Sequence, residues 1–232
     1  RSSVVEIVVP STYQPPNGCK FKARALHYAA VTDGASAAKR HDWIIHMDEE
    51  TRFNEVTVAH VLDHCMREHT RWVSGATEYG AIGQGVILYN VHVIESTICS
   101  LADTIRVGDD YGKFQLQYRV AAQPLIGMHG SLVVCQQAVE LDFGFDHGME
   151  GSITEDTFFA MHIAAHGVQV KWCHGFMYEQ SPFSVWDFAK QRRRWYAGLW
   201  LCVRSPRLVR WRRAFLGVHV VSWALCPALN LL

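Results

Sequence analysis

The sequence predicts an α/β fold with a mixed, mainly parallel β-sheet flanked by helices and followed by a membrane helix. Short apolar runs alternate along the chain with longer segments whose apolar residues recur at helical spacing, an order typical of a sheet covered by helices. Hydrophobic residues make up 49% of the 232 residues and charged residues 19%. This composition supports a core and excludes a disordered chain.

Each element rests on a local pattern. The strands are short apolar or β-branched runs, and the helices are longer segments such as the one that places Val58, Val61 and Cys65 on one face. Proline and glycine mark loops at residues 12–19 and 142–152. The predicted order is strand 4–9, helix 21–30, strand 43–47, helix 56–69, strand 85–89, helix 93–114, strand 130–135, helix 154–165, strand 168–172 and helix 185–201.

The neutral total charge, 22 basic against 22 acidic residues, hides three zones. Residues 1–184 carry 13 basic and 21 acidic residues, a net charge of −8. Residues 185–213 carry nine basic residues and one acidic residue, a net charge of +8, and residues 214–232 carry none of either sign. We therefore divide the chain into an acidic body, a basic helical region and an apolar tail.

The apolar tail has the length of a membrane-spanning helix. Crossing a bilayer takes roughly 20 residues, and arginines directly before such a segment are typical of its cytoplasmic flank. We expect the chain to be a fragment that stops inside its first membrane span. The alternative for residues 214–232 is a buried core helix. In either case an apolar segment directly after the basic region argues against nucleic acid as the partner.

The seven cysteines are scattered along the chain without a C-x-x-C pair. This spacing predicts neither a disulfide framework nor a zinc site. A reducing compartment is the expectation.

An acidic motif, Asp48-Glu49-Glu50, directly follows the apolar run at 43–47. In a strand, residues i and i+2 point the same way, so Asp48 and Glu50 are expected to project together. Two carboxylates at the carboxyl end of a buried strand are able to hold Mg²⁺ or Mn²⁺ with phosphate oxygens. The alternative is a solvated acidic turn.

A second acidic pair, Glu155 and Asp156, opens the helix predicted at 154–165. Ser152 and Glu155 also fit a capping box, in which case the acids only stabilise the start of the helix. A carboxylate at a helix start beside a glycine-rich loop is also placed to accept a proton from an attacking hydroxyl.

A polar helix face follows at Gln191, Arg194 and Trp195, which are spaced i, i+3 and i+4. A guanidinium suits a diphosphate, and an indole suits a sugar ring. The alternative is a basic helix attracted to anionic headgroups. Lys22, at a predicted helix start, is a weaker candidate for a phosphate contact.

The motifs K-A-R-A-L, D-E-E-T, T-E-D and Q-R-R-R-W stand in this order, with the last just before the apolar tail. This arrangement resembles the family-2 glycosyltransferases with the GT-A (nucleotide-diphospho-sugar transferase) fold. Their D-x-D, T-E-D and Q-x-x-R-W signatures come in the same order. Glu50 stands where that family's D-x-D motif has its second aspartate, and the family's nucleoside-binding strands would precede Arg1.

The resemblance implies a role for each matching residue. Asp48 and Glu50 would hold the divalent cation and the nucleotide diphosphate, with Lys22 near the donor nucleotide. Asp156 would be the general base, with Glu155 beside it. The positions implied to contact the diphosphate and the acceptor sugar are Gln191, Arg194, Trp195, Gly130 and Ser131.

Within the family, the segments KARALHY, DWIIHMDEET, FFAMHIAAHG and MYEQSPF are similar to the invertebrate β-1,4-mannosyltransferases of glycosphingolipid synthesis. This similarity implies inverting transfer of mannose from GDP-mannose to glucosylceramide. It also implies an integral protein of the endoplasmic reticulum or Golgi membrane, with its catalytic domain on the cytosolic face. The alternatives are a UDP-sugar-dependent relative (a ceramide glucosyltransferase or a processive polysaccharide synthase) and an inactive membrane interaction protein.

Overall fold

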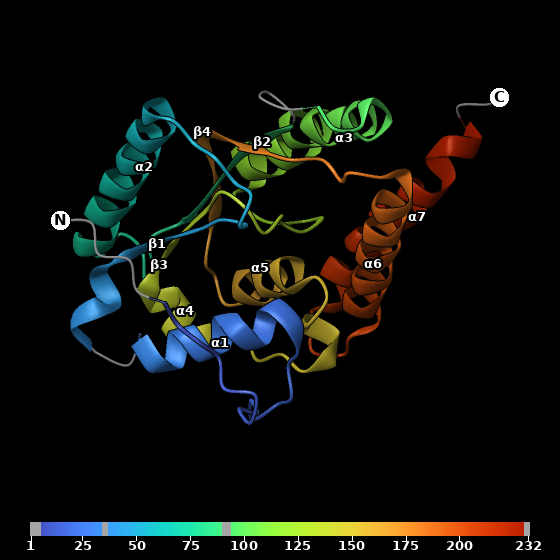
Figure 1. The fold of residues 1–232 in the computed structure, drawn as a ribbon. Helices are drawn as coiled ribbons and strands as arrows, with labels where there is room; N and C mark the ends of the chain where they lie inside the picture. The colour runs from blue at the N-terminus through green and yellow to red at the C-terminus, as the bar shows by residue number, and fades with distance from the viewer. Residues whose placement is uncertain (1–5, 34–36, 90–93, 230–232) are drawn as a thin grey trace.

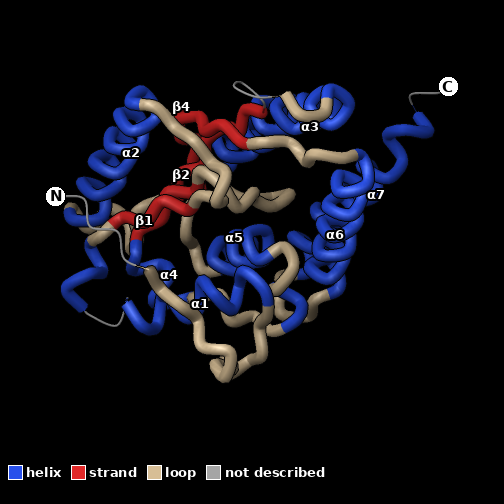
Figure 2. Tube along the Cα trace, in the orientation of Figure 1, coloured by secondary structure: helices blue, strands red, loops and turns tan. Residues whose placement is uncertain are grey.

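The computed structural model describes residues 6–33, 37–89 and 94–229 (Figure 1). A four-stranded sheet carries helices on both faces, and two long helices, α6 and α7, stand beside it (Figures 1 and 2). In chain order the elements are α1 Phe21–Asp33, a 3₁₀ turn Ala37–His41, β1 Trp43–His46, α2 Glu55–Val73, β2 Ile82–Tyr89, α3 Thr97–Asp109, π-helical segments Asp110–Phe114 and Gln117–Ala121, β3 Val133–Gln136, α4 Gln137–Phe143, a 3₁₀ turn Met149–Gly151, α5 Glu155–Ala165, β4 Val170–Glu179, α6 Val185–Arg204 and α7 Arg210–Leu229.

The predicted α/β organisation is confirmed, and the predicted mainly parallel pairing is wrong. The strand order is β1-β3-β2-β4, and β3 pairs antiparallel with both β1 and β2. Only β2 and β4 pair in parallel. Three strands therefore run one way and β3, between two of them, runs the other. β3 starts at the end of the sheet where β2 finishes, so the two strands run in opposite directions. The alternation of strands and helices along the sequence does not reveal this direction.

Most of the predicted elements correspond to observed ones. Residues 43–47, 85–89, 130–135 and 168–172 overlap β1 to β4, although β4 extends to Glu179. Residues 6–9 lie in no strand, and residues 4–5 of that predicted strand lie outside the described part of the chain, as does residue 93 of a predicted helix. That helix, 93–114, is observed as α3 followed by a π-helical segment.

Helix α2 covers one face of the sheet. It starts at Asn54, whose side chain accepts a hydrogen bond from the Thr57 amide at 3.0 Å and so satisfies a free donor of the first turn. Val61 on its apolar face packs with Leu132 and Met177 from the sheet side.

Helix α5 is buried on two sides. Phe159 and Ile163 belong to the core cluster on the other face of the sheet. Phe158 and Met161 instead pack with side chains of α6 and α7, so that α5 lies between the sheet and these two helices (Figure 1). A helix that is apolar all round requires burial of this kind.

The membrane span predicted from residue 214 is not found in the described part of the chain, where no helix is long and apolar enough to cross a bilayer. The segment forms most of α7, whose first turns also contain the arginines at 210, 212 and 213. Leu216 and Val220 on this helix are fully buried in the cluster shared with α5 and α6. Their burial matches the alternative prediction, a helix with one face in the core.

We predict that Gly85→Ala destabilises the fold. A Cβ at this position of β2 would overlap the Leu132 side chain and the Gly175 carbonyl oxygen, so the free energy of unfolding should fall by about 1–3 kcal/mol. Gly108→Ala is the control, because its Cβ would meet nothing within 4 Å. Denaturation of both purified variants tests this, and equal stability for the two would contradict the assigned packing.

Candidate active site

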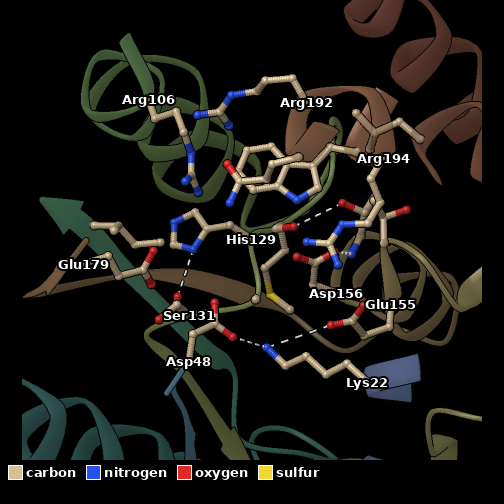
Figure 3. A pocket seen from close by; sticks show the side chains of 18 of the residues that line it. Lys22, Asp48, Arg106, His129, Ser131, Glu155, Asp156, Glu179, Arg192 and Arg194 are labelled. Carbon is tan, nitrogen blue, oxygen red and sulfur yellow. Dashed lines mark hydrogen bonds and ion pairs between the residues drawn. The ribbon is translucent and has the colours of Figure 1, made fainter. Parts of the chain in front are cut away.

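A cavity of about 650 Å³ lies between the sheet edge, the start of α5, and α3 and α6 (Figure 3). Every residue to which the sequence assigns a binding or catalytic role lines it. These residues are Lys22, Asp48, Glu50, Gly130, Ser131, Glu155, Asp156, Gln191, Arg194 and Trp195. The first and last of them, Lys22 and Trp195, are 173 residues apart in sequence, so the fold itself assembles the site.

The acidic motif lies in a turn, which corrects the strand geometry predicted for it. β1 ends at His46, and the turn is closed by two hydrogen bonds, from the Thr51 amide to the Asp48 carbonyl oxygen at 3.0 Å and from the Asp48 amide to Thr51 Oγ1 at 3.1 Å. The turn, and not the alternation of a strand, brings Asp48 and Glu50 to the cavity wall.

Lys22 connects the two acidic motifs. Its ammonium group pairs with Asp48 and lies 4.0 Å from Glu155 Oε1 (Figure 3). Burial acts to lower the pKa of Lys22, but the charge and hydrogen bond of Asp48 outweigh it and raise the pKa overall. The ammonium group therefore stays charged and balances carboxylates of both motifs.

Glu155 and Asp156 stand in the first turn of α5. The capping box predicted with Ser152 does not form, because Thr154 is the residue before the helix and the Ser152 hydroxyl accepts a hydrogen bond from the Lys20 amide at 2.9 Å while donating to the Gly148 carbonyl oxygen. Asp156 Oδ1 accepts a hydrogen bond from the Thr157 amide at 2.6 Å. Burial, and then the charge of Asp156, raise the pKa of Glu155 from 4.5 to about 7, and burial also raises the pKa of Asp156. A carboxylate with a raised pKa is a better proton acceptor.

Gly130 and Ser131 form the wall next to Asp156. A Cβ at Gly130 would lie 3.1 Å from Asp156 Oδ2, so glycine keeps the space beside this carboxylate open. Ser131 is buried, and its hydroxyl lies 3.3 Å from Thr51 Oγ1. The wall is thereby joined to the turn that carries Asp48.

Helix α6 brings its polar face to the opposite side of the cavity. Arg194 is exposed and forms no ion pair with any described residue, and the buried Oε1 of Gln191 has no hydrogen-bond partner within the described part of the chain. Two guanidinium groups lie over the Trp195 ring, that of Arg106 at 4.5 Å and that of Arg192 at 4.2 Å from its centroid. Such cation–π contacts fix the ring.

The family model described as glycosyl transferase family group 2 matches residues 43–232. The chain belongs to this family. The β-1,4-mannosyltransferases bre-3 of Caenorhabditis elegans and Caenorhabditis briggsae are each 40% identical to it over 228 residues, 98% of this chain and 48% of theirs. The β-1,4-mannosyltransferase egh of Drosophila melanogaster is 38% identical over 222 residues, 96% of this chain and 46% of its own. The predicted family membership is confirmed, and the chain spans about half the length of these curated relatives.

The cavity of this glycosyltransferase chain has a donor set that fits a divalent cation. Nine Asp and Glu side chains line it against four Lys and Arg side chains, an acidic excess that an anionic diphosphate would increase. Among the described residues no group of three or more His, Cys, Asp or Glu side chains forms a ready-made metal cage. Mg²⁺ commonly binds through one or two carboxylates together with substrate phosphates and water, and Asp48 and Glu50 meet this requirement.

Sequence reasoning missed the polar side of α3. Asp103 pairs with Arg192 and so connects α3 to α6, and Arg106 lines the cavity from the same helix. The spacing of Asp103, Arg106 and Asp110 is i, i+3 and i+7, which places them on one helix face. Such a row of charged residues on one helix face is the sequence pattern from which this part of the site could have been predicted.

His129 was also missed, because an isolated histidine gives no signal in sequence. Its Nδ1 donates to the Ser131 carbonyl oxygen at 2.8 Å, and its Nε2 lies 3.4 Å from Asp110 Oδ1. Burial acts to lower the pKa of His129, and Asp110 raises it further than burial lowers it. Asp110 therefore favours the protonated form of His129, which lies behind Gly130 and Ser131.

We predict that Glu155→Gln flattens the pH dependence of stability. The pKa of Glu155 is about 7 in the folded state against 4.5 ordinarily, so its contribution is complete below pH 4.5 and is lost as the pH rises through about 7. The free energy of unfolding of the wild type should fall more steeply over this range than that of the variant.

Urea denaturation at several pH values measures this difference. Exposed Glu78 provides the control, since Glu78→Gln should keep the wild-type slope. Equal slopes for wild type and Glu155→Gln would refute the assigned environment.

Proposed function

We propose that the full-length protein is an inverting β-1,4-mannosyltransferase with a GT-A catalytic domain, and that it transfers mannose from GDP-mannose to glucosylceramide. The observation that carries this proposal is the convergence of Asp48, Asp156 and Arg194 on one cavity. These three residues belong to the three motifs that the family resemblance identifies. The β-1,4-mannosyltransferases bre-3 and egh, to which the chain is similar, support the β-1,4-mannosyl linkage.

In this mechanism Asp156 removes the proton from the acceptor hydroxyl. Its partly exposed carboxylate faces the cavity, and Gly130 leaves room beside Oδ2 for the hydroxyl. The oxygen attacks the anomeric carbon from the face opposite the diphosphate, the carbon–oxygen bond to the diphosphate breaks, and the configuration inverts in one displacement. Burial raises the pKa of Asp156, which strengthens it as a base.

The departing diphosphate gains negative charge, which positively charged groups beside it would stabilise. Arg194 projects into the cavity without a carboxylate partner among the described residues, and its planar fork suits phosphate oxygens. A divalent cation held by Asp48 and Glu50 would offset the negative charge that builds on the leaving group. Lys22 holds the Asp48 side chain at the cavity and joins it to Glu155.

Trp195 and Gln191 are the proposed contacts of the acceptor sugar. Trp195 is fixed by Arg106 and Arg192, so its indole presents an ordered apolar plane suited to a sugar ring. Gln191 adds a buried oxygen free to accept a hydrogen bond. We also propose that the full-length protein is located at the membrane. The arginine-rich end of α6 and start of α7 would then lie beside the anionic headgroups of the cytosolic leaflet.

A donor screen with the full-length protein tests the function. We expect GDP-mannose, and not UDP-glucose, to support transfer to glucosylceramide. Asp156→Asn should lower kcat by a factor of about 10²–10⁴ and leave donor affinity unchanged, while Asp63→Asn, on the exposed face of α2, should leave both unchanged. Transfer from UDP-glucose would favour the UDP-sugar alternative, and the absence of any nucleotide-sugar binding would favour the inactive one.

Asp48→Ala tests the cation site. Removing one of the two carboxylates should abolish the dependence of GDP-mannose affinity on Mg²⁺ or Mn²⁺, measured by titration calorimetry with and without chelator. Asp63→Asn again serves as the control and should keep that dependence. An Asp48→Ala protein whose donor affinity still responds to the cation would rule out this residue as a ligand.

A further inference from the structure

A second cavity, of about 480 Å³, lies between α3, α6 and α7. Its volume falls in the range of roughly 300–1,000 Å³ that is typical of small-molecule sites. Each of the three helices contributes apolar side chains to its wall. These are Ala102, Ile105, Phe188, Tyr196, Trp223 and Ala224. We refer to this cavity as the α3–α6–α7 groove.

The groove is continuous with the candidate active site. Four residues line both cavities, namely Arg106, Asp109, Arg192 and Trp223. Three of them are charged, whereas five of the six residues that line the groove alone are apolar or aromatic, Arg193 being the exception. The groove is therefore more polar where it meets the active site and mainly apolar elsewhere. A molecule with a polar end at Asp156 and an apolar remainder matches this gradient.

The apolar surface continues outward along α3. Ile98, Leu101 and Ile105 are spaced i, i+3 and i+7, so they share one face of this helix. Their exposed fractions are 69%, 70% and 66%. A row of large apolar side chains left in water indicates a surface that binds an apolar partner.

We propose that the α3–α6–α7 groove binds the hydrocarbon chain of the glycolipid acceptor. This inference rests on the proposed function and names the path that the lipid takes from the reacting sugar. A hydrocarbon chain needs no hydrogen-bond partner, and burying its surface is favourable without any directional contact. The shared wall fixes the order of the parts, with the sugar at Trp195 and Asp156 and the chain between α3 and α7.

Two variants change the groove without touching residues assigned to the chemistry. Ala102→Trp fills the groove. Ile105→Asp places a charge in the groove, and because Ile105 is exposed the substitution should leave the fold intact. The matched controls are Ala189→Trp on α6 and Thr104→Asp on α3, which are exposed and line neither cavity. All four are made in the full-length protein.

Each protein is assayed with glucosylceramide in detergent micelles and with ethyl β-glucoside, which carries the same sugar without a lipid. Both groove variants should lower kcat/KM for glucosylceramide by about tenfold or more and leave kcat/KM for ethyl β-glucoside unchanged. Neither control should alter either value. Equal losses on both acceptors, or no loss on glucosylceramide, would overturn the proposal.

A second measurement separates this proposal from the proposed function. Glucosylceramide with a photoactivatable group at the end of its acyl chain is cross-linked to the wild type and to Ala102→Trp. Labelling of peptides from α3 and α6 in the wild type, lost in the variant, supports the groove even if no mannose is transferred. Labelling elsewhere, or labelling that Ala102→Trp leaves intact, overturns the groove and leaves the catalytic proposal standing.

Discussion

The burial of α5 between the sheet and the α6–α7 pair is the constraint on which the site depends. Phe159 and Ile163 fix this helix against the sheet, while Phe158 and Met161 fix it against α6 and α7. Because both sides are packed, the first turn of α5 has one available position. That position presents Asp156 to the cavity, opposite the polar face of α6.

Ion pairs between charged side chains fix the cavity wall further. The cavity wall holds more acids than bases, and two of the four cations are already committed, Lys22 to Asp48 and Arg192 to Asp103. Each of these pairs joins elements distant in sequence, so breaking one affects position as well as charge. Arg106 and Arg194, without ion-pair partners among the described residues, carry the positive charge that remains for an anionic substrate.

Trp195 shows how the aromatic and ionic parts depend on each other. Its indole is fixed by Arg192 of its own helix and by Arg106 of α3. The pair between Arg192 and Asp103 then holds α3 against α6. The α3 and α6 parts of the wall shared by the two cavities are thus joined to each other, and a change in either helix affects both cavities.

The sequence alone determined the family and the α/β class, and it predicted ten residues that line one cavity, because motif order and helical spacing are local properties. It did not predict Arg106 or His129, which line the same cavity. It also placed Gln191, Arg194 and Trp195 on one face of a helix. Only the tertiary structure decided the direction of β3, the pairing of Lys22 and the burial of Leu216 on α7. Each of these is a contact between segments far apart in the chain, and local periodicity carries no information about such contacts.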